Sequence, residues 1–62
     1  MTPEEILEKA KRMEYDAIKT YLELKKDADT ETSELLEFLI SQEREHLQMI
    51  NDRLKALRIL KK

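Results

Sequence analysis

The fold is decided by residues 35–57, which read LLEFLISQEREHLQMINDRLKAL. Apolar residues recur in this stretch at alternating spacings of three and four, which predicts one face of an amphipathic α-helix. Glu43 and His46 interrupt the apolar stripe at its middle, and because they are three residues apart they lie on one face of the helix. The stripe consists of Leu36, Leu39, Glu43, His46, Ile50, Leu54 and Leu57, and Leu35, Ile40 and Leu47 broaden it.

The helical pattern extends from this stretch in both directions. It continues almost to the end of the chain, and the small polar residues before it include Asp29 or Thr30 as the expected N-cap. Ahead of them, strong helix-forming residues run back almost to the N-terminus. We therefore expect an all-α fold, a single domain over residues 1–62, with one helix at about 3–27 and an antiparallel second helix at about 31–60.

The first helix carries a start signal. Thr2, Pro3 and Glu5 form a capping box with proline at the first helical position. Acidic residues near this start and basic residues near the end of the second helix both suit the helix dipole. These residues are Glu4, Glu5 and Glu8 at the start, and Lys55, Arg58, Lys61 and Lys62 at the end.

Composition excludes several classes of protein. The 62 residues include no Cys and no Gly, which excludes disulfides, thiolate metal sites and Gly-rich phosphate loops. No apolar run is long enough to cross a membrane, and a net charge of −2 gives no electrostatic case for nucleic acid. The acidic start is unlike a signal peptide. We therefore expect the protein to be in the cytoplasm. A chain this short buries little apolar surface alone, so we expect a non-thiolate metal, a second copy, or both.

A stripe on the first helix also contains one carboxylate, Glu14. Antiparallel packing is expected to bring Glu14 toward the level of Glu43 and His46. An unpaired carboxylate in a buried stripe is costly, so this group needs a cation, a hydrogen-bond partner or a proton. Met13 and Met49 flank the stripes and are expected to fill the core. The first-helix stripe consists of Leu7, Ala10, Glu14, Ala17, Tyr21, Leu24 and Ala28.

Two such hairpins packed face to face would form a four-helix bundle. Each chain supplies Glu14 from the first helix and Glu43-x-x-His46 from the second. A two-fold pair therefore holds four Glu and two His, which is the ligand set of di-iron and di-manganese carboxylate bundles. Carboxylate and imidazole ligands suit iron and manganese, imidazole also suits zinc, and four carboxylates neutralise two divalent ions.

Two other functions stay open on these residues. An isolated His such as His46 is more often a core histidine with a satisfied hydrogen bond, and Glu14 and Glu43 would then fix the register of a coiled coil by pairing with Lys or Arg. Under this interpretation, the protein is a metal-free structural module that dimerises. The second alternative is a bundle that binds zinc or manganese without redox turnover.

The spacing of these residues resembles that of a known superfamily. Glu14-x-x-Ala17-x-x-x-Tyr21, followed by Glu43-Arg44-Glu45-His46, is similar to the half-unit of ferritin-like and rubrerythrin-like di-iron proteins. The likeness is greatest to encapsulated ferritins, which are short two-helix chains that form their bundle by dimerising. It covers roughly residues 6–58.

The resemblance implies a ferroxidase, an enzyme that oxidises Fe(II) to Fe(III) at a di-iron site between two subunits, for iron storage or detoxification. It implies that Glu14 and His46 are terminal ligands and that Glu43 bridges the two irons, with manganese or zinc as substitutes. It also implies a homodimer, a higher oligomer of dimers, and an encapsulin shell protein as partner, inside an encapsulin nanocompartment of the cytoplasm.

Three further residues have two interpretations each. Tyr21 matches a family tyrosine near the site, but packing is the commoner role of such a residue. Glu31 and Glu34 cluster at the start of the second helix. They could attract incoming cations, whereas capping and a favourable interaction with the helix dipole form the simpler interpretation.

Overall fold

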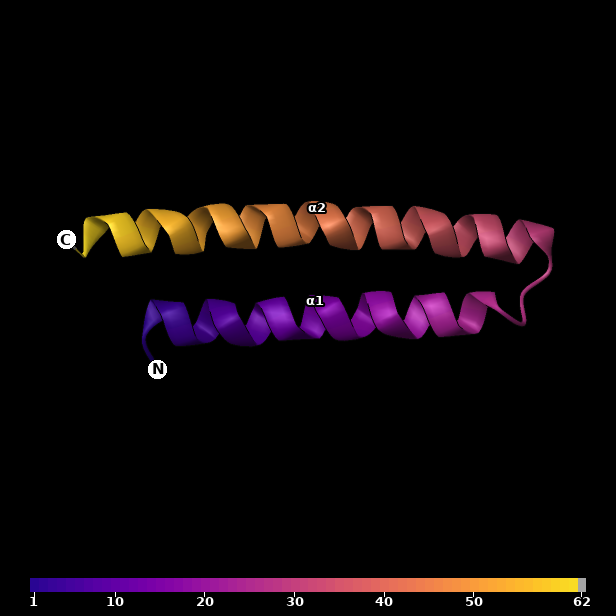
Figure 1. The fold of residues 1–62 in the computed structure, drawn as a ribbon, viewed down its shortest axis with the longest axis horizontal. Coiled ribbons are helices and arrows are strands. Elements are labelled where there is room, and N and C mark those ends of the chain that lie inside the picture. Colours follow the sequence, from indigo (N-terminus) through magenta and orange to yellow (C-terminus); the bar gives the residue numbers. More distant parts are fainter. Residues whose placement is uncertain (62) are drawn as a thin grey trace.

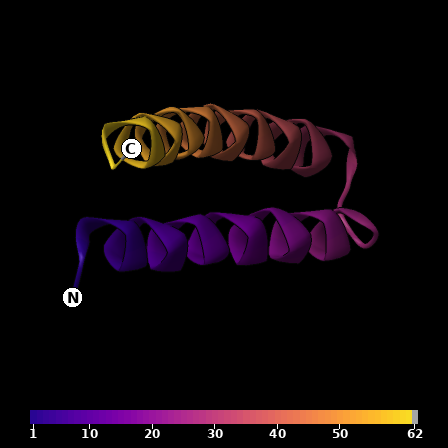
Figure 2. The same cartoon turned by 60° about the vertical axis from the view of Figure 1, so that its left-hand side comes forward.

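In the computed structural model, residues 1–61 form two antiparallel helices joined by a short turn (Figure 1). Helix α1 spans Pro3–Lys25 and helix α2 spans Thr30–Leu60. The molecule is a rod of 49 × 17 × 11 Å, and both ends of the chain lie at the same end of the rod (Figures 1 and 2). The predicted all-α hairpin is thus confirmed. Lys62, one of the basic residues expected near the helix end, lies outside the described residues.

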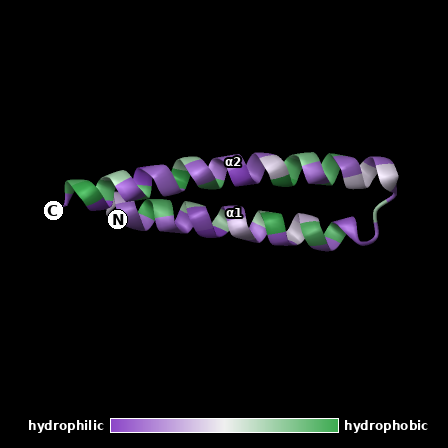
Figure 3. Ribbon diagram, turned by 45° about the horizontal axis from the view of Figure 1, so that its top comes forward, coloured by the Kyte–Doolittle hydropathy of each residue, from purple (hydrophilic) through white to green (hydrophobic). Residues whose placement is uncertain are grey.

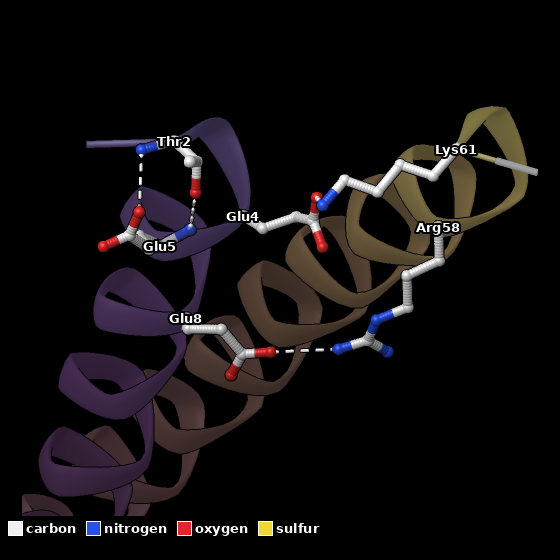
Figure 4. Close-up of polar contacts among 6 residues, drawn as sticks. All are labelled: Thr2, Glu4, Glu5, Glu8, Arg58 and Lys61. Carbon is white, nitrogen blue, oxygen red and sulfur yellow. Dashed lines mark hydrogen bonds and ion pairs between the residues drawn. The ribbon is translucent and has the colours of Figure 1, made fainter.

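Local chemistry defines where both helices begin. The Thr2 N–H donates to the Glu5 carboxylate and the Glu5 N–H donates to the Thr2 hydroxyl, both at 3.1 Å, so the predicted capping box is confirmed (Figure 4). Asp29 caps α2 by accepting the Thr32 N–H at 3.1 Å. Helix α1 ends at Lys25, slightly before the expected position near residue 27, because the chain then tightens into a turn of i→i+3 hydrogen bonds.

The cap at Asp29 makes stability depend on pH. Hydrogen bonds from the Thr32 hydroxyl, and then from its backbone N–H, lower the pKa of Asp29. A carboxylate whose pKa is lowered on folding stabilises the fold above its unfolded pKa, and this stabilisation is lost as pH falls through the folded pKa. Between about pH 5 and about pH 2, we expect the melting temperature of the wild-type chain to fall further than that of Asp29→Asn, because Asn caps a helix at either pH. Melts followed by circular dichroism measure both falls, and equal falls would contradict the prediction.

The contact between the helices has a small apolar core. The buried side chains in the described part of the chain all come from α2, and α1 contributes half-buried residues against them. The buried residues are Leu36, Ile40, Leu47 and Leu54. The half-buried residues of α1 are Leu7, Ala10, Glu14, Ala17, Ile18, Tyr21 and Lys25, with Glu4, Glu8 and Lys11 nearer the open end.

Ion pairs join the two helices at both ends of the hairpin. At the open end, Arg58 Nη2 lies 3.0 Å from Glu8 Oε1, and Lys61 Nζ lies 2.7 Å from Glu4 Oε1 (Figure 4). Near the turn, Lys25 pairs with Glu37, and its hydrogen bond and positive charge lower the pKa of the Glu37 carboxyl. Solvent screens such exposed pairs, so they define the register of the helices more than they add stability.

The two broad faces of the hairpin differ in character. One face has a shallow hollow lined by Leu22, Lys25, Glu37, Ile40 and Arg44. We call this side of the hairpin the polar face. The opposite face, which we call the open face, carries apolar residues at helical spacing on both helices. The open face consists of Ile6, Met13, Ala17 and Leu24 on α1, and of Leu35, Leu39, His46, Ile50 and Leu57 on α2.

The exposure of individual side chains corrects two expectations from the sequence. Met13 and Met49, expected in the core, are largely exposed in the single hairpin. His46 is exposed as well, and Leu39 is only half-buried, so the stripe predicted on α2 is not buried as one unit. Figure 3 shows hydrophobic and hydrophilic residues interleaved along both helices, with hydrophilic central turns in α2. Within the described residues, neither helix combines the length and apolar character needed to cross a membrane.

Candidate metal centre

Three polar side chains meet halfway along the hairpin. Glu14 comes from the middle of α1, and Glu43 and His46 come from the middle of α2. One ligand atom from each residue lies within 4.8 Å of the other two. His46 Nδ1 is 3.5 Å from Glu14 Oε2 and 3.7 Å from Glu43 Oε2. The structure therefore brings together the three residues that the sequence singles out, and their role as metal ligands stays a prediction.

The position of each residue on its helix explains the geometry. Glu43 lies beside the buried stripe of α2, and its side chain is 19% exposed. His46 is one turn further along and closer to the open face, with a side chain that is 48% exposed. Glu14 faces them from α1 and is 22% exposed. The group, which we call the carboxylate–histidine cluster, is consequently closed on the side of the hairpin core and accessible from the open face.

The cluster has an unsatisfied acceptor. Glu14 Oε2 is buried and accepts no hydrogen bond from any described residue. Its separation of 3.5 Å from His46 Nδ1 is within ion-pair range but makes no hydrogen bond. A buried carboxylate oxygen without a partner is costly, and a cation bound beside it would remove that cost.

Positively charged side chains offer this cluster no partner within residues 1–61. The Lys and Arg ion pairs found there involve Glu4, Glu8 and Glu37. A register-fixing pair between Glu14 or Glu43 and a Lys or Arg is therefore not formed among residues 1–61. The donor set of two carboxylates and one imidazole matches what iron, manganese and zinc accept.

One hairpin supplies an incomplete coordination shell. Counted as one ligand atom from each residue, its three donors are fewer than the four of a tetrahedral ion or the six of an octahedral ion. The cluster fits iron, manganese or zinc in donor chemistry and in its unsatisfied oxygen, and it leaves positions on the side of the open face for further ligands.

The remaining candidates lie apart from the cluster. Tyr21 is half-buried on α1, two turns beyond Glu14, or about 10 Å along the helix axis. Glu31 and Glu34 are exposed near the start of α2, and their role toward incoming cations stays a prediction. The described residues contain no other group of His and acidic side chains arranged to hold a metal ion. Prediction from sequence therefore missed no second candidate centre among them.

Comparison with known proteins identifies the family. The model of the rubrerythrin family matches residues 5–62, which include all three residues of the cluster. An uncharacterized protein from Archaeoglobus fulgidus is 66% identical over 62 residues, covering 100% of this chain and 98% of that protein. No solved structure matches the chain significantly. The chain therefore belongs to the rubrerythrin family, within the ferritin-like superfamily of di-iron carboxylate proteins.

Proposed function

We propose that two copies of this chain pair through their open faces and act as a ferroxidase of the encapsulated-ferritin type. Iron is the substrate: each Fe(II) gives one electron to O₂, and the reduced oxygen takes up protons. The observation that carries this proposal is the carboxylate–histidine cluster in a chain of a di-iron family. Redox turnover is the known chemistry of that family, and it favours iron over a bundle that holds zinc without turnover.

The ligand count supports a site with two irons. Two copies supply two sets of Glu14, Glu43 and His46, which is the four-Glu, two-His set of di-iron bundles. The four carboxylates balance the charge of two Fe(II) ions and attract the extra charge of Fe(III). In the proposed site, Glu14, Glu43 and His46 would hold the irons, and the His46 atom nearest the two carboxylates is Nδ1.

The exposed surface supports a second copy as the partner. The hairpin exposes 5067 Å², whereas a compact monomer of its mass exposes roughly 4,200 Å². The excess of roughly 800 Å² equals one partner's share of a standard protein interface. The open face carries exposed apolar residues that such an interface would bury. The cluster also lacks metal ligands on the side of the open face.

Oxidation of Fe(II) in air tests the proposal. With the wild-type chain, we expect ferric absorbance to rise faster than in buffer alone, with a fast phase that saturates at two irons per pair of chains. If the chain binds Fe(II) stoichiometrically but does not speed its oxidation, the result would instead favour a bundle that binds zinc or manganese without redox turnover. Absence of binding would favour the metal-free dimerisation module.

A pair of leucines on α1 tests the role of the open face. Leu24 is 54% exposed on the open face, and Leu22 is 45% exposed on the polar face. We expect Leu24→Lys to weaken pairing and slow iron oxidation by at least about tenfold, because it places a charge inside the interface. Leu22→Lys is the matched control and should leave both unchanged. Equal effects of the two substitutions, measured by sedimentation and ferric absorbance, would count against pairing through the open face.

The wider assembly rests on the family likeness. We propose that the dimers join into a higher oligomer inside an encapsulin shell in the cytoplasm, where Fe(III) is stored or made harmless. Co-expression with an encapsulin shell protein, followed by separation of intact shells, tests this. The chain should appear within the purified shells, and its exclusion from them would contradict this part of the proposal.

A further inference from the structure

The three methionines of the chain lie on different surfaces of the hairpin. Met13 belongs to the open face of α1 and directly precedes Glu14 of the carboxylate–histidine cluster. Met49 follows the buried Leu47 by two residues, so it lies about 200° around α2 from it, on the side away from α1. Met1 precedes α1. Met13 is therefore the methionine that pairing through the open faces would cover.

The methionine side chains are open to oxidation by hydrogen peroxide. Met13 is 65% exposed and Met49 is 63% exposed, so peroxide reaches both equally well in the single hairpin. The thioether sulfur bonds to one peroxide oxygen, the O–O bond breaks, and the other oxygen leaves as water. The sulfur loses two electrons and the peroxide gains them. The product is a sulfoxide, which is polar where the thioether was apolar.

The proposed function supplies this oxidant. Two Fe(II) ions give two electrons to O₂, which takes up two protons and becomes hydrogen peroxide. Peroxide released from one pair of chains reaches unpaired hairpins nearby, where Met13 is exposed.

We infer that Met13 is a peroxide-sensitive modification site whose sulfoxide stops two hairpins from pairing through their open faces. The inference rests on the proposed function, since it uses the same interface. Each pair of chains buries two copies of Met13, so oxidation would place two polar sulfoxides in one interface. The neighbours of Met13 toward the hairpin contact, Ala10 and Ala17, have side chains without a hydrogen-bond donor. Burying a polar group without a partner is costly, and pairing is weakened accordingly.

Position decides which methionine acts in this way. A sulfoxide at Met49 or Met1 stays in solvent when the open faces meet, and so adds no cost to pairing. Pairing in turn covers Met13 and protects it from peroxide. The modification therefore acts on hairpins that have not yet paired, and it lowers the number of new metal centres when peroxide accumulates. Methionine sulfoxide reductases reverse it.

Sedimentation of the full chain before and after peroxide treatment tests the inference. The chain is treated at a dilution that leaves it unpaired, peroxide is removed, and mass spectrometry of peptides measures the sulfoxide at each methionine. Oxidised wild type should have a dimer dissociation constant at least about tenfold above that of the untreated chain. Met13→Leu, a swap of similar volume, should pair equally well before and after treatment. Met49→Leu is the matched control and should lose pairing as wild type does.

A second pair of variants needs no oxidant. Glutamine is polar and close to methionine in length, so Met13→Gln should pair at least about tenfold more weakly than wild type, whereas Met49→Gln should pair as wild type does. Treatment of the oxidised wild-type chain with a methionine sulfoxide reductase should restore pairing.

Three results would overturn the inference. One is a wild-type chain that carries sulfoxide at Met13 and pairs as tightly as the untreated chain. Another is a Met13→Gln variant that pairs as wild type does. The third is a chain in which peroxide modifies Met49 but leaves Met13 unmodified while the hairpins are unpaired.

The untreated wild-type chain separates this inference from the proposed function. If it pairs and oxidises iron, but Met13 sulfoxide leaves pairing unchanged, the inference is wrong and the proposed function stands. If it stays monomeric at every concentration, pairing through the open faces and its control by Met13 are both wrong.

Discussion

Replacing Glu43 and His46 together by alanine should reduce the rate of iron oxidation to that of Fe(II) in buffer alone. The two substitutions remove two of the three donors that one chain brings to the carboxylate–histidine cluster. Loss of a residue that merely orients a metal ligand lowers affinity or activity by about 10- to 100-fold, so loss of two ligands should exceed about 100-fold. Stopped-flow absorbance in air measures the rate, and anaerobic titration measures the loss of stoichiometric Fe(II) binding.

The matched control for this double variant is Glu45→Ala. Glu45 lies between the two mutated residues but is exposed and outside the cluster. It should bind and oxidise iron at the wild-type rate. Helicity measured by circular dichroism should be unchanged in both proteins, because the side chains of Glu43, Glu45 and His46 make no hydrogen bond within residues 1–61. A double variant that oxidises iron as fast as the parent would show that these residues are not the site.

Replacing Leu54 by alanine should remove most of the stability of the metal-free hairpin. Leu54 is the most deeply buried side chain in the described structure, at 1% exposed. Truncating a buried leucine to alanine costs about 2–5 kcal/mol, while a chain of this length has a total stability of roughly 3–9 kcal/mol. With so few buried residues, little else can compensate. We expect a loss of helical signal at room temperature, or a urea midpoint lowered by more than half.

Leu22→Ala provides the comparison for Leu54→Ala. Leu22 is exposed on the polar face, so its truncation should change the free energy of unfolding by no more than about 0.5 kcal/mol. Urea unfolding of both variants in the presence of a chelator gives the two values. Similar losses in the two variants would mean that α1 and α2 do not pack around Leu54 as described.

The ends of the helices follow from sequence because they depend on neighbouring residues. Thr2 and Glu5 satisfy each other's backbone N–H groups, and Asp29 satisfies that of Thr32. The meeting of Glu14 with Glu43 and His46 also follows from sequence. Antiparallel helices with residue spacings of three and four leave little freedom in which side chains share a level.

Burial on α2 is harder to predict, because the helix carries two adjacent apolar stripes. The sequence pattern joins them into one, which runs through Leu36, Leu39 and His46. In the hairpin, α1 covers only the stripe that contains Leu36 and Leu47. The other stripe lies on the open face, where a single chain has nothing to cover it. Hydrophobic spacing shows which residues favour burial but does not distinguish burial within one chain from burial between two.

Anomalous diffraction at the iron absorption edge, from crystals of the iron-loaded protein, would show directly whether the carboxylate–histidine cluster holds two irons between paired chains. We expect two iron peaks for each pair of chains, on either side of a two-fold axis. Each peak should lie within bonding distance of Glu14, Glu43 and His46 side chains. An iron-loaded crystal with no peak at this cluster, or with peaks only at other acidic side chains, would contradict it.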